Sequence, residues 1–171
     1  MAWTEPQDWK AGDSVTAALL NSNLSANENE LYHLIAVQSA DVTRNNSAVL
    51  TDLTGLSFAV TSGEVWVFFC AIYFSSAATP DVKHTVTAPA ATTGRFGLIS
   101  YGTPLTAASN ATYGGNVART VQNSAADVTL ITGTLTAGAN GTVQVQGAQN
   151  TATASDTTFN KGSFIVAWRK S

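Results

Sequence analysis

From residue 41 to the C-terminus the sequence repeats one pattern, in which short stretches rich in valine, threonine and aromatic residues alternate with turn signals such as Ser62-Gly63 and Lys161-Gly162. Such stretches are typical of β-strands. A parallel sheet needs crossover helices, and the short spacing leaves no room for them. We therefore expect a mainly β fold, a jelly-roll-like antiparallel β-sandwich. The expected strands are Val42–Leu50, Leu56–Val60, Val65–Phe74, Val82–Ala88, Arg95–Tyr101, Asn116–Gln122, Val128–Thr136, Thr142–Ala148 and Ser163–Arg169.

The stretch Val65–Phe74 differs from the others because it is apolar on both faces. A sandwich strand normally buries one face only. We expect one face to be covered by the opposing sheet and the other by the N-terminal helix or by another subunit. The candidate core or interface residues of this strand are Trp66, Phe68, Phe69, Ile72 and Phe74.

Residues 1–13 show no periodicity and predict an irregular arm. Trp3 and Trp9 are its candidate anchors, because exposed indoles on such an arm often insert into a neighbour's groove. Packing of both indoles back onto their own domain is the alternative.

Residues 14–38 carry the signals of a helix. Ser14 or Thr16 can cap a short first segment, and Ser25 with Glu28 forms a capping box for a second segment that ends near Ala36. A spacing of four and three residues is typical of a short coiled-coil seam, in which an asparagine can fix the register; a single amphipathic helix on its own sheet is the alternative. The seam residues are Leu20, Leu24, Asn27, Leu31 and Leu34.

The chain thus divides into an N-terminal attachment arm and helix at 1–40 and a β-sandwich body at 41–171. Only 11% of the residues are charged, against about 25% in typical soluble proteins. The eight basic residues are scattered, which argues against a nucleic-acid partner. The sequence shows no signal peptide and no apolar run of the ~20 residues that a membrane helix needs. We therefore expect synthesis in a cytoplasm and no membrane partner.

Groups able to perform catalysis are few. His33 and His84 fit no metal-ligand spacing, and Cys70 lies in the most apolar stretch, where an inert core role is expected. No nucleophile elbow or phosphate loop is present. The sequence therefore predicts no enzyme activity and no cofactor. Tyr101 and Tyr113 flank a loop at 102–115; they are the candidates for glycan binding, and a simple loop with its anchor is the alternative.

The segment Trp9–Asn21 resembles a segment common in virion proteins of tailed bacteriophages, of the form W-x-x-G-x-x-(V/L)-T-A-x-x-L-N. The stretches 56–66, 78–83 and 161–169 are similar to parts of β-sandwich domains in phage decoration and tail accessory proteins. The resemblance implies a virion structural protein, commonly trimeric, with no enzymatic residues to transfer.

Within that group we expect a capsid decoration (cement) protein. It would lie on the outer surface of the capsid of the virion, as a homotrimer that binds the major capsid protein and stabilises the shell. One small body without a repetitive shaft favours this role, as does a loop poor in aromatic and charged residues. A tail, fibre or host-attachment module is the alternative, and a glycan-binding, lectin-like sandwich is a further one.

Overall fold

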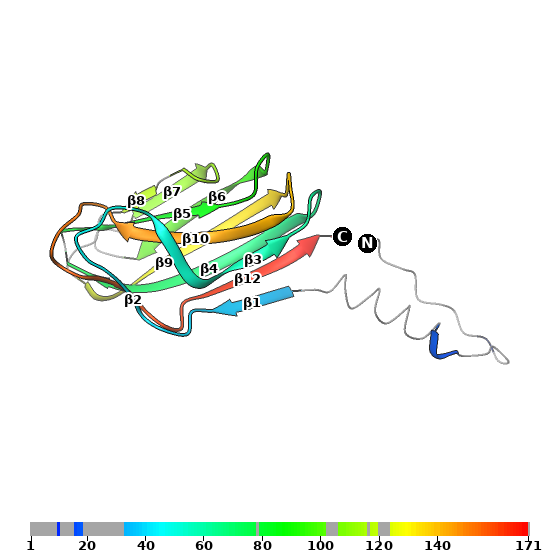
Figure 1. Cartoon of the computed structure of the whole chain (residues 1–171), viewed down its shortest axis with the longest axis horizontal. Helices are drawn as coiled ribbons and strands as arrows, with labels where there is room; N and C mark the ends of the chain where they lie inside the picture. The colour runs from blue at the N-terminus through cyan, green and yellow to red at the C-terminus, as the bar shows by residue number, and fades with distance from the viewer. Residues whose placement is uncertain are drawn as a thin grey trace.

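The computed structural model describes residue 10 and residues 16–18, 33–77, 79–101, 106–115, 117–119 and 124–170. These residues form twelve strands in two antiparallel sheets that face each other, which confirms the expected mainly β, antiparallel architecture (Figure 1). In the part of the chain that the structure describes, no helix is long and apolar enough to span a membrane. The jelly-roll order of connections stays a prediction.

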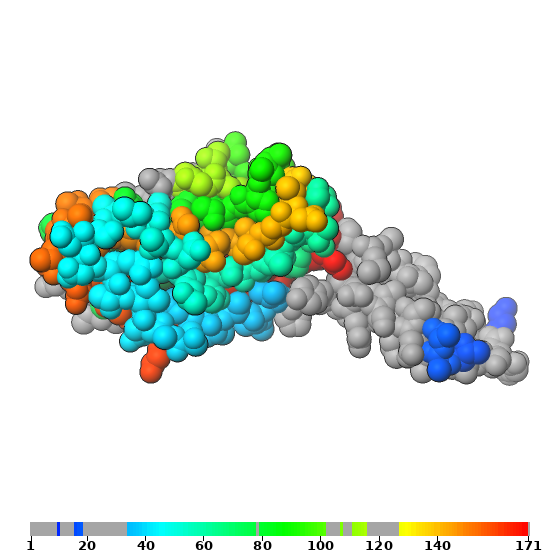
Figure 2. All heavy atoms as spheres, in the orientation of Figure 1, coloured from blue at the N-terminus to red at the C-terminus, as the bar shows by residue number. Residues whose placement is uncertain are grey.

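The larger sheet has eight strands, and six of them follow one continuous order. The continuous order is β1 (His33–Val37), β12 (Phe164–Lys170), β4 (Val65–Ser76), β9 (Ser124–Thr136), β6 (Thr93–Tyr101) and β7 (Thr106–Ala111). Two short strands pair beside the Ser76 end of β4, where β11 (Thr157–Phe159) pairs with β4 and with β2 (Val42–Arg44). The smaller sheet has the order β3 (Thr51–Val60), β10 (Gly141–Gln149), β5 (Val82–Thr87) and β8 (Val117–Arg119). Figure 2 shows the body with β10 in orange and with β1 in blue along its lower margin.

The core lies between the two sheets. The even-numbered residues of β4 point inward, and Phe68, Ile72 and Phe74 are completely buried there. Trp66 is 3% exposed, and its ring centroid lies 5.2 Å from that of Phe58 on the opposing sheet. Full burial of one such side chain stabilises the fold by roughly 1.5–3 kcal/mol. Four of the five candidate residues of this strand are therefore core residues, and only Phe69 points to the other side.

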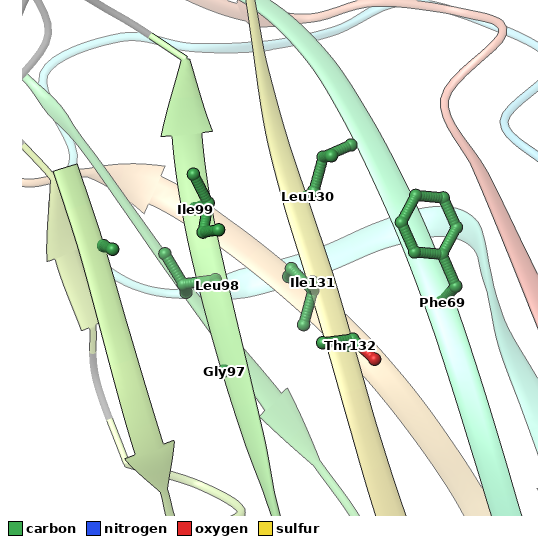
Figure 3. Close-up of a pocket in the computed structure, with 8 residues that line it drawn as sticks. Phe69, Gly97, Leu98, Ile99, Leu130, Ile131 and Thr132 are labelled. Atoms are coloured by element: carbon green, nitrogen blue, oxygen red, sulfur yellow. The ribbon is translucent and has the colours of Figure 1, made fainter. Parts of the chain in front are cut away.

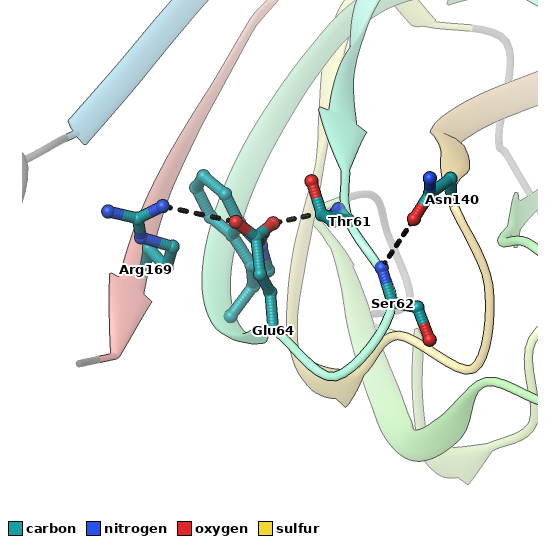
Figure 4. Close-up of polar contacts among 6 residues, drawn as sticks. Thr61, Ser62, Glu64, Asn140 and Arg169 are labelled. Atoms are coloured by element: carbon teal, nitrogen blue, oxygen red, sulfur yellow. Dashed lines mark hydrogen bonds and ion pairs between the residues drawn. The ribbon is translucent and has the colours of Figure 1, made fainter. Parts of the chain in front are cut away.

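The turn before β4 is held by one carboxylate (Figure 4). Glu64 accepts hydrogen bonds from the backbone N–H of Thr61 (2.8 Å) and from the indole N–H of Trp66 (3.1 Å). Its other oxygen lies 3.0 Å from the Arg169 guanidinium on β12. Burial raises the pKa of Glu64, but these hydrogen bonds and the positive charge of Arg169 outweigh it, so the net shift is downward. The carboxylate thus joins the start of β4 to the end of the chain.

The prediction that the helix continues to about Ala36 is wrong. Residues 33–37 form β1, which pairs with β12 from His33↔Trp168 to Val37↔Phe164. Leu34, expected in the helical seam, packs with Ala36 against the core, whereas Ile35 and Val37 face outward. This alternation fits a half-buried strand, and the open edge of β12 supplies its hydrogen-bond partners. The sheet therefore includes residues that the boundary at residue 40 assigns to the N-terminal segment.

Other predictions for the N-terminal segment lie outside the described residues. Ala17 and Ala18 have a helical backbone, but no helix is defined among the described residues of this segment, so the N-terminal helix stays a prediction. The arm anchors Trp3 and Trp9 and the seam residues Leu20, Leu24, Asn27 and Leu31 are not among the residues that the structure describes.

Three further differences concern short strands. Residues 106–111, expected as loop, form β7 on the edge of β6, and residues 157–159 form β11. The expected strand at 42–50 is shortened to β2, whereas within the expected strand at 116–122 the described residues 117–119 form β8. β7 is poor in the β-branched and aromatic residues that favour strands, so its pairing depends on the neighbouring edge of β6 and not on local propensity.

Candidate interaction surface

The outward side of the larger sheet is the candidate functional surface, and we call it the outer face. Strand register fixes which residues share a row across it. One row is entirely apolar over six strands, and the next is apolar except for one threonine. The first row is Val37, Phe164, Ala71, Leu130, Ile99 and Ala107, and the second is Ile35, Val166, Phe69, Thr132 and Gly97.

The outer face holds most of the exposed apolar side chains. Among the described residues, eight large apolar side chains are exposed, and all but Val49 lie on this face. They are Ile35 (61% exposed), Val37, Val67, Tyr73, Ile99, Tyr101 and Trp168. Monomeric soluble proteins rarely expose apolar patches beyond a few hundred Å², and larger ones mark interaction sites. The outer face therefore has the character of a binding surface.

Part of the outer face is hollow. A depression of about 570 Å³ lies over β4, β9, β6 and β7, and Figure 3 shows Phe69, Leu130 and Ile99 around it. It forms because Gly97 has no side chain and Ala107 has only a methyl group, whereas the larger side chains stand beside them. Among the described residues that line this depression none is titratable, so it suits an apolar side chain rather than a reaction.

On the described part of the outer face, charge lies at the two ends: Arg95 and Lys170 point outward at one end, and Asp127, 8% exposed, lines a hollow with Tyr73 and Tyr101 at the other. Of the outward side chains that the structure describes on β12, β4, β9 and β6, only Arg95 and Lys170 are charged. Lys170 pairs with Val65 and Arg95 with Thr134, so both lie toward the start of β4. The two apolar rows carry no charge, and burying them against another protein avoids the cost of desolvating ions.

The two tyrosines proposed for glycan binding are not brought together. Tyr101 is 53% exposed at one end of the outer face, in a row with Val128 and Tyr73. Tyr113 packs against the core, with its ring centroid 5.7 Å from that of Phe96, and donates a hydrogen bond to the Thr134 carbonyl (2.8 Å). Burial raises its pKa. Tyr113 is therefore an anchor for the turn after β7.

Cys70 and His84 both lie in the core, and His84 is the one histidine whose surroundings the structure describes. Cys70 is completely buried, and this burial raises its pKa, as expected for an inert core thiol. His84 is also fully buried, with its ring edge-on to Phe74 (5.9 Å) and Phe159 (5.7 Å). Across the described ranges, no three histidine, cysteine or acidic residues are grouped as metal ligands.

Of the residues on the outer face, sequence reasoning identified Phe69, as one side of a doubly apolar strand, and Tyr101, as a candidate for glycan binding. It missed Ile35, Ile99, Leu130 and Trp168. A usable signal was present in the last strand, because Phe164-Ile165-Val166-Ala167-Trp168 is also apolar at every position. When two neighbouring strands such as β4 and β12 are apolar on both faces, the opposing sheet covers one face and the other face of the sheet stays apolar.

No protein-family model matches the chain, and no curated protein is similar enough in sequence to count as a relative. Among solved structures, the chain is similar to a structure of the infectious bursal disease virus Gt strain, with a TM-score of 0.24 and 8% identity over 84% of this chain and 38% of that chain. A crystal structure of the infectious bursal disease virus VP2 subviral particle gives a TM-score of 0.22 and 10% identity over 80% of this chain and 39% of that one. The chain thus spans about two fifths of the length of these proteins.

Proposed function

We propose that this chain is a structural virion protein, a decoration protein that binds the assembled shell of a tailed phage as a homotrimer. The observation that carries the proposal is the outer face, where two neighbouring rows of side chains across the larger sheet are uncharged and, apart from Thr132, apolar. A chain with this surface is suited to permanent assembly. The similarity of Trp9–Asn21 and of the later strands to phage virion proteins supports the same role.

In this proposal the two parts of the chain have different tasks. The body associates with copies of itself, and the arm at residues 1–13 contacts the major capsid protein through Trp3 and Trp9. Binding only to the assembled shell would stabilise it by mass action, in proportion to RT ln(1 + [L]/Kd). No catalytic step is involved.

The first experiment measures binding to shells. Purified shells without the protein are mixed with the full chain or with a chain lacking residues 1–13, and bound protein is counted by sedimentation and gel densitometry. The full chain should bind in hundreds of copies per particle and the truncated chain should not bind, although its circular dichroism spectrum remains that of the folded body. Equal binding of the two chains would assign attachment to the body, and a few copies per particle would favour the tail or fibre alternative.

The second experiment uses salt. Apolar burial is little affected by ionic strength, whereas interactions between exposed charges are largely screened at molar salt. The bound fraction should therefore be unchanged between about 0.1 M and 1 M NaCl. Release of the protein at the higher concentration would show that charge pairing holds it to the shell, contrary to the proposal.

A further inference from the structure

We propose that the outer face is the contact between copies of this chain, and that its two unlike halves meet. The β1–β12 half of one copy covers the β9–β6–β7 half of the next copy. This inference deepens the proposed function, because it rests on the homotrimer and assigns the surface that forms it.

The two halves of the outer face differ in shape. On the β1–β12 half, large side chains protrude: Ile35 is 61% exposed, Val37 52% and Trp168 46%. On the other half Ile99 and Tyr101 are also exposed, but this half carries the depression of about 570 Å³ at Gly97 and Ala107. Ile35 and Val37 occupy the same two rows as Gly97 and Ile99. The protruding side chains and the depression therefore lie at the same height along the strands, but on opposite halves of the outer face.

The whole outer face has about the area of one standard interface, which the two contacts of each copy would share. Six strands at a spacing of about 4.8 Å are roughly 29 Å wide, and three to four rows of outward residues at about 6.8 Å cover roughly 20–27 Å along the strands. The product is about 600–800 Å². A standard protein–protein interface buries about 800 Å² on each partner. In a ring of unlike halves each contact covers about half of the face, roughly 300–400 Å² on each partner, and the two contacts of each copy together cover the whole face.

Charge also suits a second copy. The two central rows are neutral, so identical surfaces bring no like charges together there. Arg95 and Lys170 lie at one end, outside these rows. A partner chosen by charge would require a matching set of acidic or basic groups, whereas a copy of the chain requires none.

Contact between unlike halves can build a ring of three copies, and it can also close a dimer about a two-fold axis along the strands. A ring of three satisfies every half and matches the homotrimer of the proposed function. Contact between like halves would instead close at two copies and would place protruding side chains against protruding side chains.

The test introduces one cysteine in each half, with Ile35→Cys and Ile99→Cys combined in the full chain. Within one copy these positions lie four strands apart, roughly 19 Å, and a disulfide requires Cα atoms closer than about 7 Å. The natural Cys70 is completely buried and does not compete. On mild oxidation the double variant should form disulfide-linked dimers and trimers in non-reducing electrophoresis, and reduction should return them to monomers.

Three controls accompany it. Each single variant should remain largely uncrosslinked, as should Val49→Cys combined with Ile99→Cys, because Val49 is 68% exposed but lies outside the outer face. Efficient crosslinking by Ile35→Cys alone would show that like halves meet and would overturn the inference. An oligomer in which the double variant does not crosslink would also overturn the inference. A monomeric wild-type chain would overturn it as well, and this result is expected if the N-terminal segment or the capsid protein covers the outer face.

A second variant measures assembly directly. Ile99→Lys places a charge beside the depression, and light scattering should show a fall from three copies to one, whereas Val49→Lys should leave three. An unchanged mass for a folded Ile99→Lys protein would overturn the inference. Crosslinked trimers that fail to bind shells would contradict the proposed function alone, and shell binding without the crosslink would contradict this inference alone.

Discussion

The ring of Phe68 on β4 lies directly against Gly133 on β9, its register partner. A Cβ atom at Gly133 would lie 2.6 Å from two atoms of that ring and 3.0 Å from the Cβ of Phe96. Phe68 is completely buried and Phe96 is 1% exposed, so neither side chain has room to move. Gly133 therefore provides the space that a core aromatic residue fills.

Gly133→Ala should destabilise the body by about 1–3 kcal/mol, the usual cost of overpacking a core. The measurement is chemical denaturation followed by tryptophan fluorescence. If the Phe68 ring causes the cost, the double variant Gly133→Ala with Phe68→Leu should be more stable than the sum of the two single changes predicts. Simple additivity would mean that the ring is not the obstacle.

Glu64→Gln should lower stability by roughly 1–2 kcal/mol at neutral pH, because the group loses its charge-assisted bond to Arg169. Solvent screening at this partly exposed pair keeps the effect small. The pKa of Glu64 is lowered from its usual 4.5, so its contribution is present above that value and is lost as pH falls through the folded pKa. Melting temperatures of the two proteins should converge in acid, and a constant gap down to pH ~2.5 would contradict this account.

Asp127→Asn should stabilise the protein at neutral pH. Burial raises the pKa of Asp127 above its usual 3.8, partly opposed by the hydrogen bond from the Val128 N–H, and its Oδ2 has no hydrogen-bond partner among the described residues. A raised pKa means that stability is lost as pH rises through the folded value. The melting temperature of the variant should therefore exceed that of the wild type at pH 7 and approach it below pH ~3.5.

Gln149→Leu should cost about 2–4 kcal/mol, because buried backbone groups would lose their partners. The fully buried Gln149 side chain accepts hydrogen bonds from the N–H groups of Ser47 and Thr153 and donates to the carbonyls of Arg44 and Ser155.

The matched control is Gln146→Leu on the same strand. The hydrogen bond that the Gln146 side chain donates to Asp52 is solvent-exposed, so the change should stay within about 0.5 kcal/mol. Similar losses for both variants in thermal unfolding would show that the buried network is not the cause.

Much of the fold could be predicted because the long strands carry their own signals. β4, β5, β9, β10 and β12 were expected within a few residues of their observed bounds, since apolar alternation and turn residues delimit them. β1 was assigned to a helix because the spacing of leucines up to Leu34 fits a helical period. β7 and β11 form only because a neighbouring edge accepts them, and such non-local pairing leaves no local signal.

The candidate surface was mostly beyond sequence reasoning. Ile35, Leu130 and Trp168 are far apart along the chain and share a face only through the register of several strands. Phe69 was identified because both faces of its own strand are apolar. A local pattern shows which residues alternate, but it does not show which strands stand side by side.

The pairing of β1 with β12 gives the body a polarity. Because His33 pairs with Trp168, the polypeptide enters and leaves the sandwich at the same pole. The loop at 150–156 follows the end of β10 and precedes Thr157, which pairs with Ser76 at the far end of β4, so it lies at the opposite pole (Figure 1). If the N-terminal segment grips a particle, a peptide inserted near the exposed Ala152 would point away from it, and the molecule would serve as a scaffold for dense epitope display.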